Sequence, residues 1–265
     1  MSQPRWTQPR TIAIVNQKGG VGKTTTTINL GAALAESGRR VLIVDLDPQG
    51  NASTGLAIED RSKTTYDLLL DATPLAEVVQ TTAIDNLSIA PATTDLSSAD
   101  MEMMSNESRS FLLRNALTEG GVANDYDVVL IDCPPSLSLL TVNAMVAAHS
   151  ILVPLQSEFF ALEGLSQLLL TVRQIRSAAN PGLRIEGVVL TMFDGRNNLA
   201  QQVEADARET LGELVFTTIV PRNVRVSEAP SFGQPVLTYD SGSKGSQSYR
   251  ALAAELTGDI MEAPV

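Results

Sequence analysis

The chain has 265 residues, of which 43% are hydrophobic, 18% charged and 4% aromatic, and its formal net charge is −11. This composition excludes a disordered chain, and the acidic balance excludes a globally basic nucleic-acid binder, although a local basic patch is still compatible with it. One cysteine excludes an internal disulfide framework and a four-cysteine zinc site, and no apolar run is long enough to span a membrane.

The beginning of the chain differs in character from the rest. Residues 1–10 contain no apolar stretch, so we expect a flexible leader there and no secretory signal. A single cysteine is typical of a reducing compartment, which predicts a cytoplasmic protein. No Pro-, Gly- or Ser-rich linker divides the remainder, and residues 11–265 are therefore predicted to form a single domain.

Apolar, β-branched runs alternate with longer amphipathic stretches along the whole chain. The first kind predicts buried strands and the second predicts helices. The least regular stretch, residues 53–91, is a candidate for a mobile insertion. In chain order the pattern predicts strand 11–16, helix 23–37, strand 40–45, strand 87–90, helix 99–118, strand 127–132, helix 137–148, strand 150–154, helix 162–179, strand 184–190, helix 199–211, strand 215–220 and helix 243–260.

The fold class follows from this alternation. Strands that are apolar along nearly their whole length are typical of a parallel sheet that is buried on both faces. Repeated β-α units predict an α/β fold, with a mostly parallel, twisted sheet and helices on both of its faces. The low aromatic content indicates a core built from Ala, Val, Leu and Ile.

A glycine-rich sequence, KGGVGKTT at residues 18–25, lies between the first predicted strand and the first predicted helix. This is the context of a phosphate-binding P-loop, where glycines let the backbone approach the anion and N–H groups at the helix N-terminus bind it. Lys23 is placed to reach the β- and γ-phosphates, and the Thr24 hydroxyl to ligate Mg²⁺. We therefore predict a Rossmann-like P-loop NTPase whose phosphate-binding residues are Lys18, Gly19, Gly20, Val21, Gly22, Lys23, Thr24 and Thr25.

The loop departs from the general P-loop pattern, because Gln17 occupies the position of its first glycine and Lys18 is an additional cation. In both respects it resembles the ParA/MinD family of ATPases, whose loop reads K-G-G-x-G-K-[ST]. The resemblance implies a Mg²⁺-dependent ATP hydrolase with ATP/ADP and Mg²⁺ as cofactors. It also implies that Lys18 reaches across a dimer interface to the other subunit's nucleotide, so that a homodimer forms when ATP is bound.

Acidic residues end two of the predicted strands. Asp45 and Asp47 lie at the end of strand 40–45, which we expect to adjoin the P-loop strand. Their segment, DLDPQGN, resembles the family's D-x-D-P-Q-G-N switch, which implies that Asp47 orients the attacking water and that Asp45 holds the loop or the magnesium shell. Asp132 ends strand 127–132, where an acid is typical of a Mg²⁺ ligand. The expected catalytic residues are Lys18, Lys23 and Asp47, and the expected metal ligands are Thr24, Asp47 and Asp132.

Cys133 follows Asp132 and is the only cysteine of the chain. Related iron proteins of nitrogenase use two cysteines per chain to hold a cluster between subunits, so that function is not expected here. A buried, inert thiol is the better interpretation.

The C-terminal part of the chain contains a further segment of the same resemblance. Residues 221–231, PRNVRVSEAPS, resemble the P-R-N-V-R-x-S-E-A-P-S segment of chromosomal ParA proteins, where this loop lies near the adenine. Pro221 and Asn223 are therefore candidates for base contacts, with Met192 packed nearby. ParA dimers bind double-stranded DNA without sequence preference, and phosphate contacts suffice for that. The candidate DNA-binding residues are Arg196, Arg222, Arg225, Lys244 and Arg250.

The resemblance implies a ParA-type ATPase for chromosome or plasmid partitioning, associated with the nucleoid and stimulated by a ParB-like centromere-binding partner. One alternative is a MinD-type ATPase of cell division; its basic amphipathic anchor has no counterpart in residues 256–265, so no membrane partner is expected. A second alternative is a ParA-like protein that positions another cargo. A third is a metabolic relative such as an amidotransferase-type ligase, whose ATP turnover would depend on a metabolite.

Overall fold

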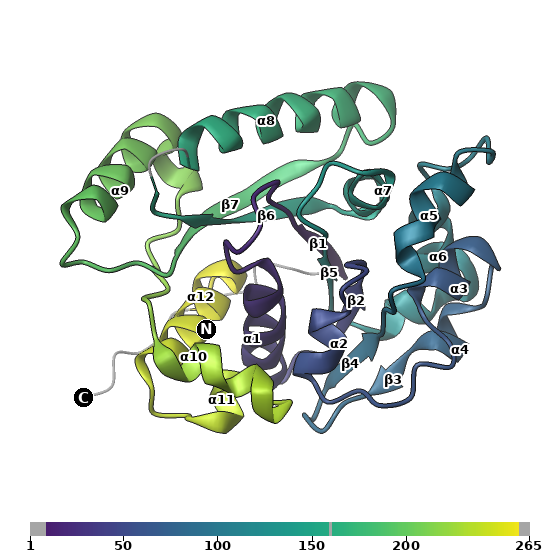
Figure 1. Cartoon of the computed structure of the whole chain (residues 1–265), viewed down its shortest axis with the longest axis horizontal. Coiled ribbons are helices and arrows are strands. Elements are labelled where there is room, and N and C mark those ends of the chain that lie inside the picture. Colours follow the sequence, from purple (N-terminus) through teal and green to yellow (C-terminus); the bar gives the residue numbers. More distant parts are fainter. Residues whose placement is uncertain (1–8, 159–160, 260–265) are drawn as a thin grey trace.

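The computed structural model describes residues 9–158 and 161–259, and its framework is one seven-stranded sheet (Figure 1). The strand order is β3-β4-β2-β5-β1-β6-β7, and every neighbouring pair is parallel except the short pair β3–β4. The predicted α/β fold with a mostly parallel sheet is confirmed. The strands are β1 (Arg10–Ile14), β2 (Val41–Asp45), β3 (Gln80–Thr81), β4 (Leu87–Ala90), β5 (Val128–Asp132), β6 (Ser150–Gln156) and β7 (Arg184–Thr191).

Alternate residues of the strands pack into two cores, one on each face of the sheet. Ile12 and Ile14 of β1 join the core that α1 (Lys23–Glu36) and α12 (Lys244–Thr257) cover. Ala13 belongs to the other core, beneath α7 (Leu139–Ala147) and α8 (Ala161–Ala178). Figure 1 shows these helix pairs on opposite sides of the sheet. Burial on both faces explains why the strands are apolar throughout.

The remaining helices surround this framework and are mostly short. Their bounds are α2 (Asn51–Gly55), α3 (Thr65–Leu70), α4 (Leu75–Val78), α5 (Leu96–Met103), α6 (Leu112–Thr118), α9 (Asn198–Leu211), α10 (Val224–Glu228) and α11 (Val236–Tyr239), with 3₁₀ helices η1 (Glu119–Asp125), η2 (Gly212–Leu214) and η3 (Ala229–Phe232).

The expectation that strand 40–45 adjoins the P-loop strand is wrong. The strand β5 lies between β2 and β1 and pairs with both in parallel. Its register places Asp132 opposite Asp45 of β2 and opposite Ile14 of β1. Strand order depends on long-range packing, which the order of segments along the chain does not determine. The consequence is that Asp132 lies between the P-loop strand and the Asp45–Asp47 segment.

The strand predicted at 215–220 does not form. This segment lies beside β7, where the Phe216 and Val220 N–H groups donate to β7 carbonyls, each at 2.9 Å, but the bridges at Val215 and at Pro221 are isolated and no continuous ladder forms. The N–H groups of Thr217 and Thr218 donate instead to the Glu255 carboxylate of α12, at 2.6 and 2.8 Å. A side-chain acceptor from a distant helix therefore takes the donors that a continuous ladder would use.

The helix predicted at 99–118 is two helices, α5 and α6, joined by a polar connection. The buried Asn143 of α7 holds this junction, because its amide donates to the Arg109 carbonyl at 2.7 Å and accepts from the Leu113 N–H at 3.2 Å. A polar run rich in Ser and Asn competes with helix formation, since such side chains bond to nearby backbone.

Residues 53–91, which we considered as a mobile insertion, are regular. They contain α3 and α4 as well as β3 and β4, and Thr64 and Asp67 form a capping box at the start of α3. Strand β1 begins at Arg10, so the last residue assigned to the leader belongs to the sheet. The rest of that leader, residues 1–8, and the end of the predicted helix 243–260 at Ile260 lie outside the described residues.

We expect Glu255→Ala to lower the free energy of unfolding by about 1–3 kcal/mol, because it removes the acceptor of two backbone N–H groups. Glu255→Gln, which keeps one carbonyl acceptor, should lose less. Urea unfolding followed by circular dichroism measures both variants. Equal stability of Glu255→Ala and the unaltered chain would show that water replaces the carboxylate at no cost.

Candidate functional site

The P-loop connects β1 to α1 at the carboxyl edge of the sheet. Gly20 and Gly22 adopt left-handed backbone angles, with φ of 74° and 87°, which side chains other than glycine rarely permit. Gly22 caps α1 without any side-chain acceptor, so the first N–H groups of the helix are not bonded by a cap. This arrangement is suited to bind an anion.

Hydrogen bonds with two other strands fix the shape of this loop. Asn16 donates to the Pro154 carbonyl of β6 at 2.8 Å, and its carbonyl oxygen accepts from the Lys18 N–H at 3.0 Å. The Thr191 hydroxyl at the end of β7 donates to the Val21 carbonyl at 2.8 Å. The loop is therefore held in a preformed shape by β6 and β7.

Lys23 is the first residue of α1, and its side chain is buried beneath the loop. Its ammonium donates to the Lys18 carbonyl at 3.1 Å and faces the charges of Asp132 and Asp47. Burial lowers the pKa of Lys23, and these carboxylates oppose that shift. The ammonium is therefore confined at the centre of the site.

Asp132 at the end of β5 is fully buried beside α1. One of its oxygens accepts from the Thr27 hydroxyl at 3.0 Å, and the other has no hydrogen-bond partner among the described residues. Burial and then the neighbouring charge of Asp45 raise the pKa of Asp132. An unpartnered carboxylate oxygen close to the P-loop fits Mg²⁺, which takes one or two carboxylates together with phosphate oxygens.

The protein supplies few metal ligands by itself. Within residues 9–158 and 161–259, no group of three or more His, Cys, Asp or Glu side chains is arranged to hold a metal ion. A cation at Asp132 and Thr24 would therefore need the oxygens of a bound phosphate to complete its coordination.

The segment after β2 is held by Asp45. Its carboxylate accepts from the backbone N–H and the hydroxyl of Ser53, at 3.0 and 2.7 Å, and so fixes the start of α2. Asp47 is also buried, and its carboxylate accepts from the Gln49 N–H at 3.0 Å. The structure thus gives Asp45 a role in holding the loop, and one oxygen of Asp47 accepts no hydrogen bond from the residues that the structure describes.

A small cavity of about 100 Å³ opens beside Gly22 and Thr25. Its lining includes Met192, Pro221 and Asn223, three residues that are far apart in the sequence from the P-loop. The structure therefore brings together the three residues that we predicted for the base.

The additional cation of the loop lies at the surface. Lys18 is about half exposed, and its ammonium forms an ion pair with Glu158, which follows β6. Gly19 is the next residue, and a Cβ atom built on it would lie 3.9 Å from Pro135, so the segment after Asp132 adjoins this surface. Lys18 therefore lies at the surface of the loop, whereas Lys23 is buried beneath it.

The candidate DNA-binding residues do not form one group. Arg196 and Arg222 lie on adjacent loops, joined by a hydrogen bond from the Arg222 N–H to Phe193. Arg225 and Lys244 lie on α10 and at the start of α12, which pack together. Arg250 is separate: its guanidinium pairs with Glu36 at 2.6 Å and donates to Ser241.

These five cations differ in whether a carboxylate already pairs with them. Arg196 pairs with Asp194 on its own loop, and Arg225 pairs with Glu228 and Asp240. Arg222 and Lys244 have no ion-pair partner in the part of the chain that the structure describes. Partners compete with a phosphate, so Arg222 and Lys244 are the most available of the five.

Sequence analysis missed several residues that build this site. Thr27 and Thr191 bond to Asp132 and to the P-loop, and Tyr249 of α12 lines the small cavity. Asn29 joins α1 to α11, donating to the Thr25 carbonyl and accepting from the Val236 N–H, each at 2.7 Å. Only Thr27 had a usable signal, because it lies one helical turn after Lys23.

Comparisons with known proteins agree with this geometry. A family model described as an AAA domain matches residues 9–185. The chain is 54% identical to the chromosome partitioning protein ParA of Caulobacter vibrioides over 249 residues, which cover 93% of both chains. It is 50% identical to the sporulation initiation inhibitor protein Soj of Bacillus subtilis, over 94% of this chain and 98% of that one.

The chain belongs to the ParA/Soj family of chromosome-partitioning P-loop ATPases.

Solved structures show the same fold. Cobyrinic acid a,c-diamide synthase of Mycobacterium smegmatis, with bound ADP and magnesium, has a TM-score of 0.80 and 36% identity over 93% of each chain. The cell division ATPase MinD of Pyrococcus furiosus has a TM-score of 0.79 and 29% identity, over 94% of this chain and 98% of that one. The recognised resemblance to the ParA/MinD family is thereby confirmed.

We expect the Cys133 thiol to be inert in the folded chain. It is fully buried, and burial raises its pKa, so the reactive thiolate is scarce and shielded from reagents. Labelling with iodoacetamide at neutral pH should be at least about 100-fold slower than in guanidinium chloride. Equally fast labelling of folded and unfolded chains would show that the segment after β5 opens readily.

Proposed function

We propose that this chain is a partitioning ATPase that binds Mg²⁺ and ATP as a monomer, dimerises on ATP and then binds DNA non-specifically. The observation that carries the proposal is the site at the carboxyl edge of the sheet, where Lys23 and Asp132 lie beneath the P-loop. Hydrolysis to ADP and phosphate, stimulated by a ParB-like partner, would return it to the monomer. Its place would then be the cytoplasm, on the nucleoid.

The roles of the site residues follow from their positions. The free N–H groups at the start of α1 and the Lys23 ammonium bind the phosphates, and Met192, Pro221 and Asn223 surround the base. Bound Mg²⁺ would neutralise phosphate charge, with Thr24 and Asp132 as its ligands. The available oxygen of Asp47 holds a water in line with the terminal phosphate.

Dimerisation rests on Lys18, whose side chain lies at the surface beside the loop. From there it can leave Glu158 and contribute its charge to the terminal phosphate of a second copy. An exposed ion pair is worth at most about 1 kcal/mol, so the release of Glu158 is a small barrier.

The matched pair Lys18→Ala and Lys63→Ala tests this role in an Asp47→Ala background. Asp47→Ala should still bind ATP and accumulate as a dimer, because hydrolysis is blocked. Adding Lys18→Ala should weaken that dimer at least about tenfold, which is about 1.4 kcal/mol, with ATP affinity unchanged. Lys63 is similarly exposed and also forms an ion pair, with Glu77, so Lys63→Ala should change nothing. Analytical ultracentrifugation and nucleotide titration measure both.

Lys23→Ala is the reference for loss of the nucleotide, and it should abolish ATP binding. Normal dimerisation of the Lys18 variant with ATP would exclude a role of Lys18 across the interface. Normal ATP binding by Lys23→Ala would exclude the site itself.

DNA binding is expected to depend on the cations near α10. Arg225→Glu or Arg196→Glu should weaken retention on non-specific duplex about tenfold in the ATP state and reduce its salt dependence, because each change reverses one charge and also leaves its carboxylate partners without a cation beside Arg222 and Lys244. Arg40→Glu is the control, because Arg40 is equally exposed, at 55% against 53% for Arg225, and also forms an ion pair. Unchanged DNA retention in both variants, measured by fluorescence anisotropy, would remove Arg196 and Arg225 from the interface.

The alternative functions would use the same ATP-binding site, and they differ in the molecule on which ATP turnover depends. None of the described helices has both the length and the apolar character that crossing a bilayer requires. Co-sedimentation with anionic vesicles in ATP tests a MinD-type function. ATP turnover that depends on a metabolite, and neither on DNA nor on a protein, would indicate a ligase. A positioner of another cargo would keep the DNA dependence and respond to a different partner protein.

A further inference from the structure

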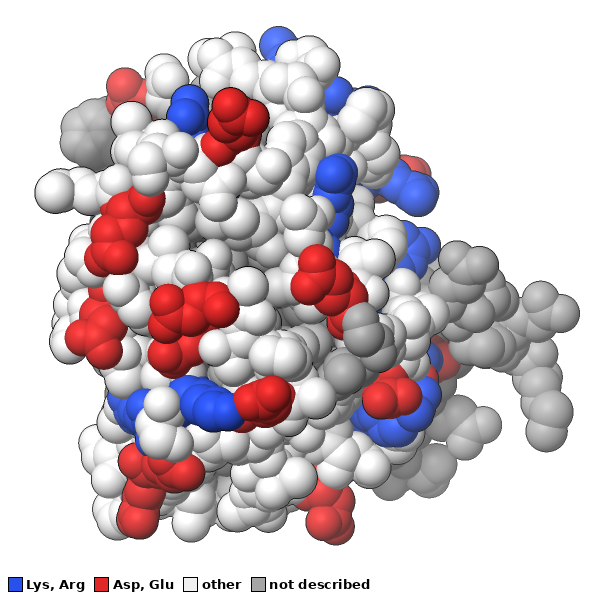
Figure 2. Space-filling view, turned by 90° about the vertical axis from the view of Figure 1, so that its right-hand side faces the viewer, with Lys and Arg blue, Asp and Glu red and all other residues white. Residues whose placement is uncertain are grey.

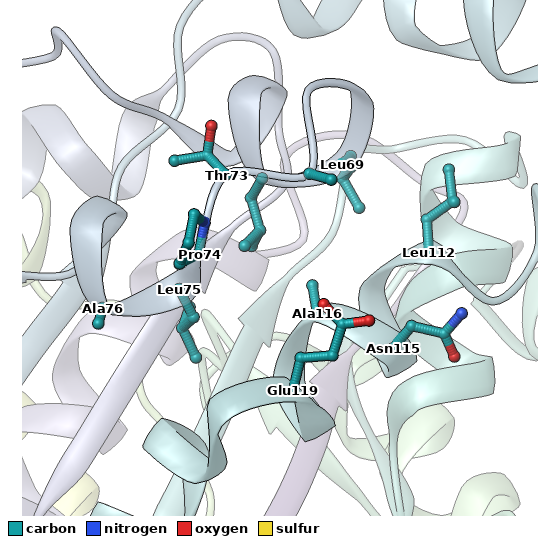
Figure 3. Close-up of a pocket in the computed structure, with 11 residues that line it drawn as sticks. Leu69, Thr73, Pro74, Leu75, Ala76, Leu112, Asn115, Ala116 and Glu119 are labelled. Atoms are coloured by element: carbon teal, nitrogen blue, oxygen red, sulfur yellow. The ribbon is translucent and has the colours of Figure 1, made fainter.

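An open apolar pocket of about 530 Å³ lies between α3, α4, α6 and η1, on a different part of the molecule from the P-loop. Leu69 and Leu75, both buried in the core, form part of its wall together with Leu112 and Ala116. Figure 3 shows these residues around the opening, with Glu119 between Leu75 and Leu112 in that view. A pocket of this size and lining is typical of a binding site.

The pocket shares no lining residue with the nucleotide cavity. Its walls belong to segments that the proposed ATPase site does not use, namely α3 and α4, which precede β3, and α6 and η1, which lie between β4 and β5. Because the leucines of its wall are also core residues, the pocket is backed by packed structure and keeps its shape without a ligand.

The surroundings of the pocket are strongly acidic. Residues 71–126, which supply most of the lining, contain nine carboxylates and two arginines, a formal charge of −7 out of −11 for the whole chain, and of these carboxylates Glu77 is paired with Lys63 from outside the range. One of these arginines, Arg114, lies over the Phe111 ring. Figure 2 shows the side of the molecule to which α3, α5 and α6 belong, and acidic side chains are spread over it, with uncharged surface and some Lys and Arg side chains between them. Asp71 and Glu119 have no ion-pair partner among the described residues.

This charge decides which class of ligand can occupy the pocket. DNA and anionic lipids would be repelled, and a second copy of the chain carries the same negative charge. A cationic ligand is attracted, and the apolar walls require that it also presents aliphatic groups. A protein segment with both kinds of side chain meets both requirements.

We propose that the pocket is the docking site for a basic amphipathic segment of a partner protein. Aliphatic side chains of that segment enter between α4 and α6, and its Lys or Arg side chains pair with Glu119 and Asp71. Met101 of α5, which packs on α3, and Met104 directly after that helix are 81% and 63% exposed. Flexible methionines of this kind suit contact with apolar side chains of varied shape. The site stands apart from the proposed ATPase, because it shares no residue with it.

The test starts with phage-displayed random peptides selected on the full chain. Selected peptides should combine aliphatic residues with Lys or Arg. Their affinity, measured by fluorescence anisotropy, should fall at least about tenfold for Ala116→Trp, which fills the pocket, and about three- to tenfold for Glu119→Lys. Glu209→Lys, a control at an exposed acid of α9, should bind within about twofold of the unaltered chain. The affinity should also weaken with added salt.

Two controls keep the result interpretable. ATP affinity should be the same in every variant, which shows that the nucleotide site remains folded. Asn115→Trp blocks the pocket from an exposed position and replaces Ala116→Trp if that variant does not fold. Failure of the ATPase proposal would leave these peptide affinities unchanged, so the two proposals fail separately.

Several outcomes would overturn the assignment. Peptides that bind Ala116→Trp and Asn115→Trp as well as the unaltered chain would place their site elsewhere. Selected peptides without basic residues would show that the acidic side chains around the pocket do not select its ligand. An ATP-independent dimer that Ala116→Trp abolishes would identify a second copy as the occupant. Peptide binding that appears only after deletion of residues 1–8 or 260–265 would identify the chain's own termini as the occupant.

Discussion

The structure depends on keeping one ammonium group, that of Lys23, buried and compensated. A buried charge without partners is strongly destabilising, so a lysine in this position requires carboxylates and a rigid loop around it. Parallel strands solve this problem, because β1, β5 and β2 all end at the same edge and bring the P-loop, Asp132 and Asp45 together. The order of the strands thus determines which charged groups meet at the proposed site.

Local sequence predicted the parts of this arrangement that neighbouring residues determine. The glycines of residues 18–25 need no tertiary information, because the left-handed angles of Gly20 and Gly22 are a local property. The buried strands were predicted because burial on both faces leaves a continuous apolar run. The grouping of Met192, Pro221 and Asn223 was also anticipated, although from family resemblance and not from spacing.

What the sequence did not predict depends on contacts between distant segments. The insertion of β5 between β1 and β2 follows from three-dimensional packing. The loss of a strand at 215–220 follows from Glu255, nearly forty residues later in the chain. Asn29 contacts Val236 across 207 residues of sequence, and no periodicity indicates such a bond. The ion pairs of Arg196, Arg225 and Arg250 could not be predicted from the sequence either. They distinguish cations whose charge is already paired with a carboxylate from those that are unpaired.

The backbone of Met192, which lines the small cavity beside the P-loop, is strained. Its backbone is left-handed, with φ of 49°, although it is neither glycine nor a residue that tolerates this region well. Such a conformation stores about 1–3 kcal/mol and persists only where the surroundings impose it. Here the end of β7 and the pairing of Phe193 with Pro221 fix the backbone on both sides. A glycine would relax this strain, but it would remove one wall of the cavity, so the left-handed backbone of Met192 is tied to the presence of its side chain there.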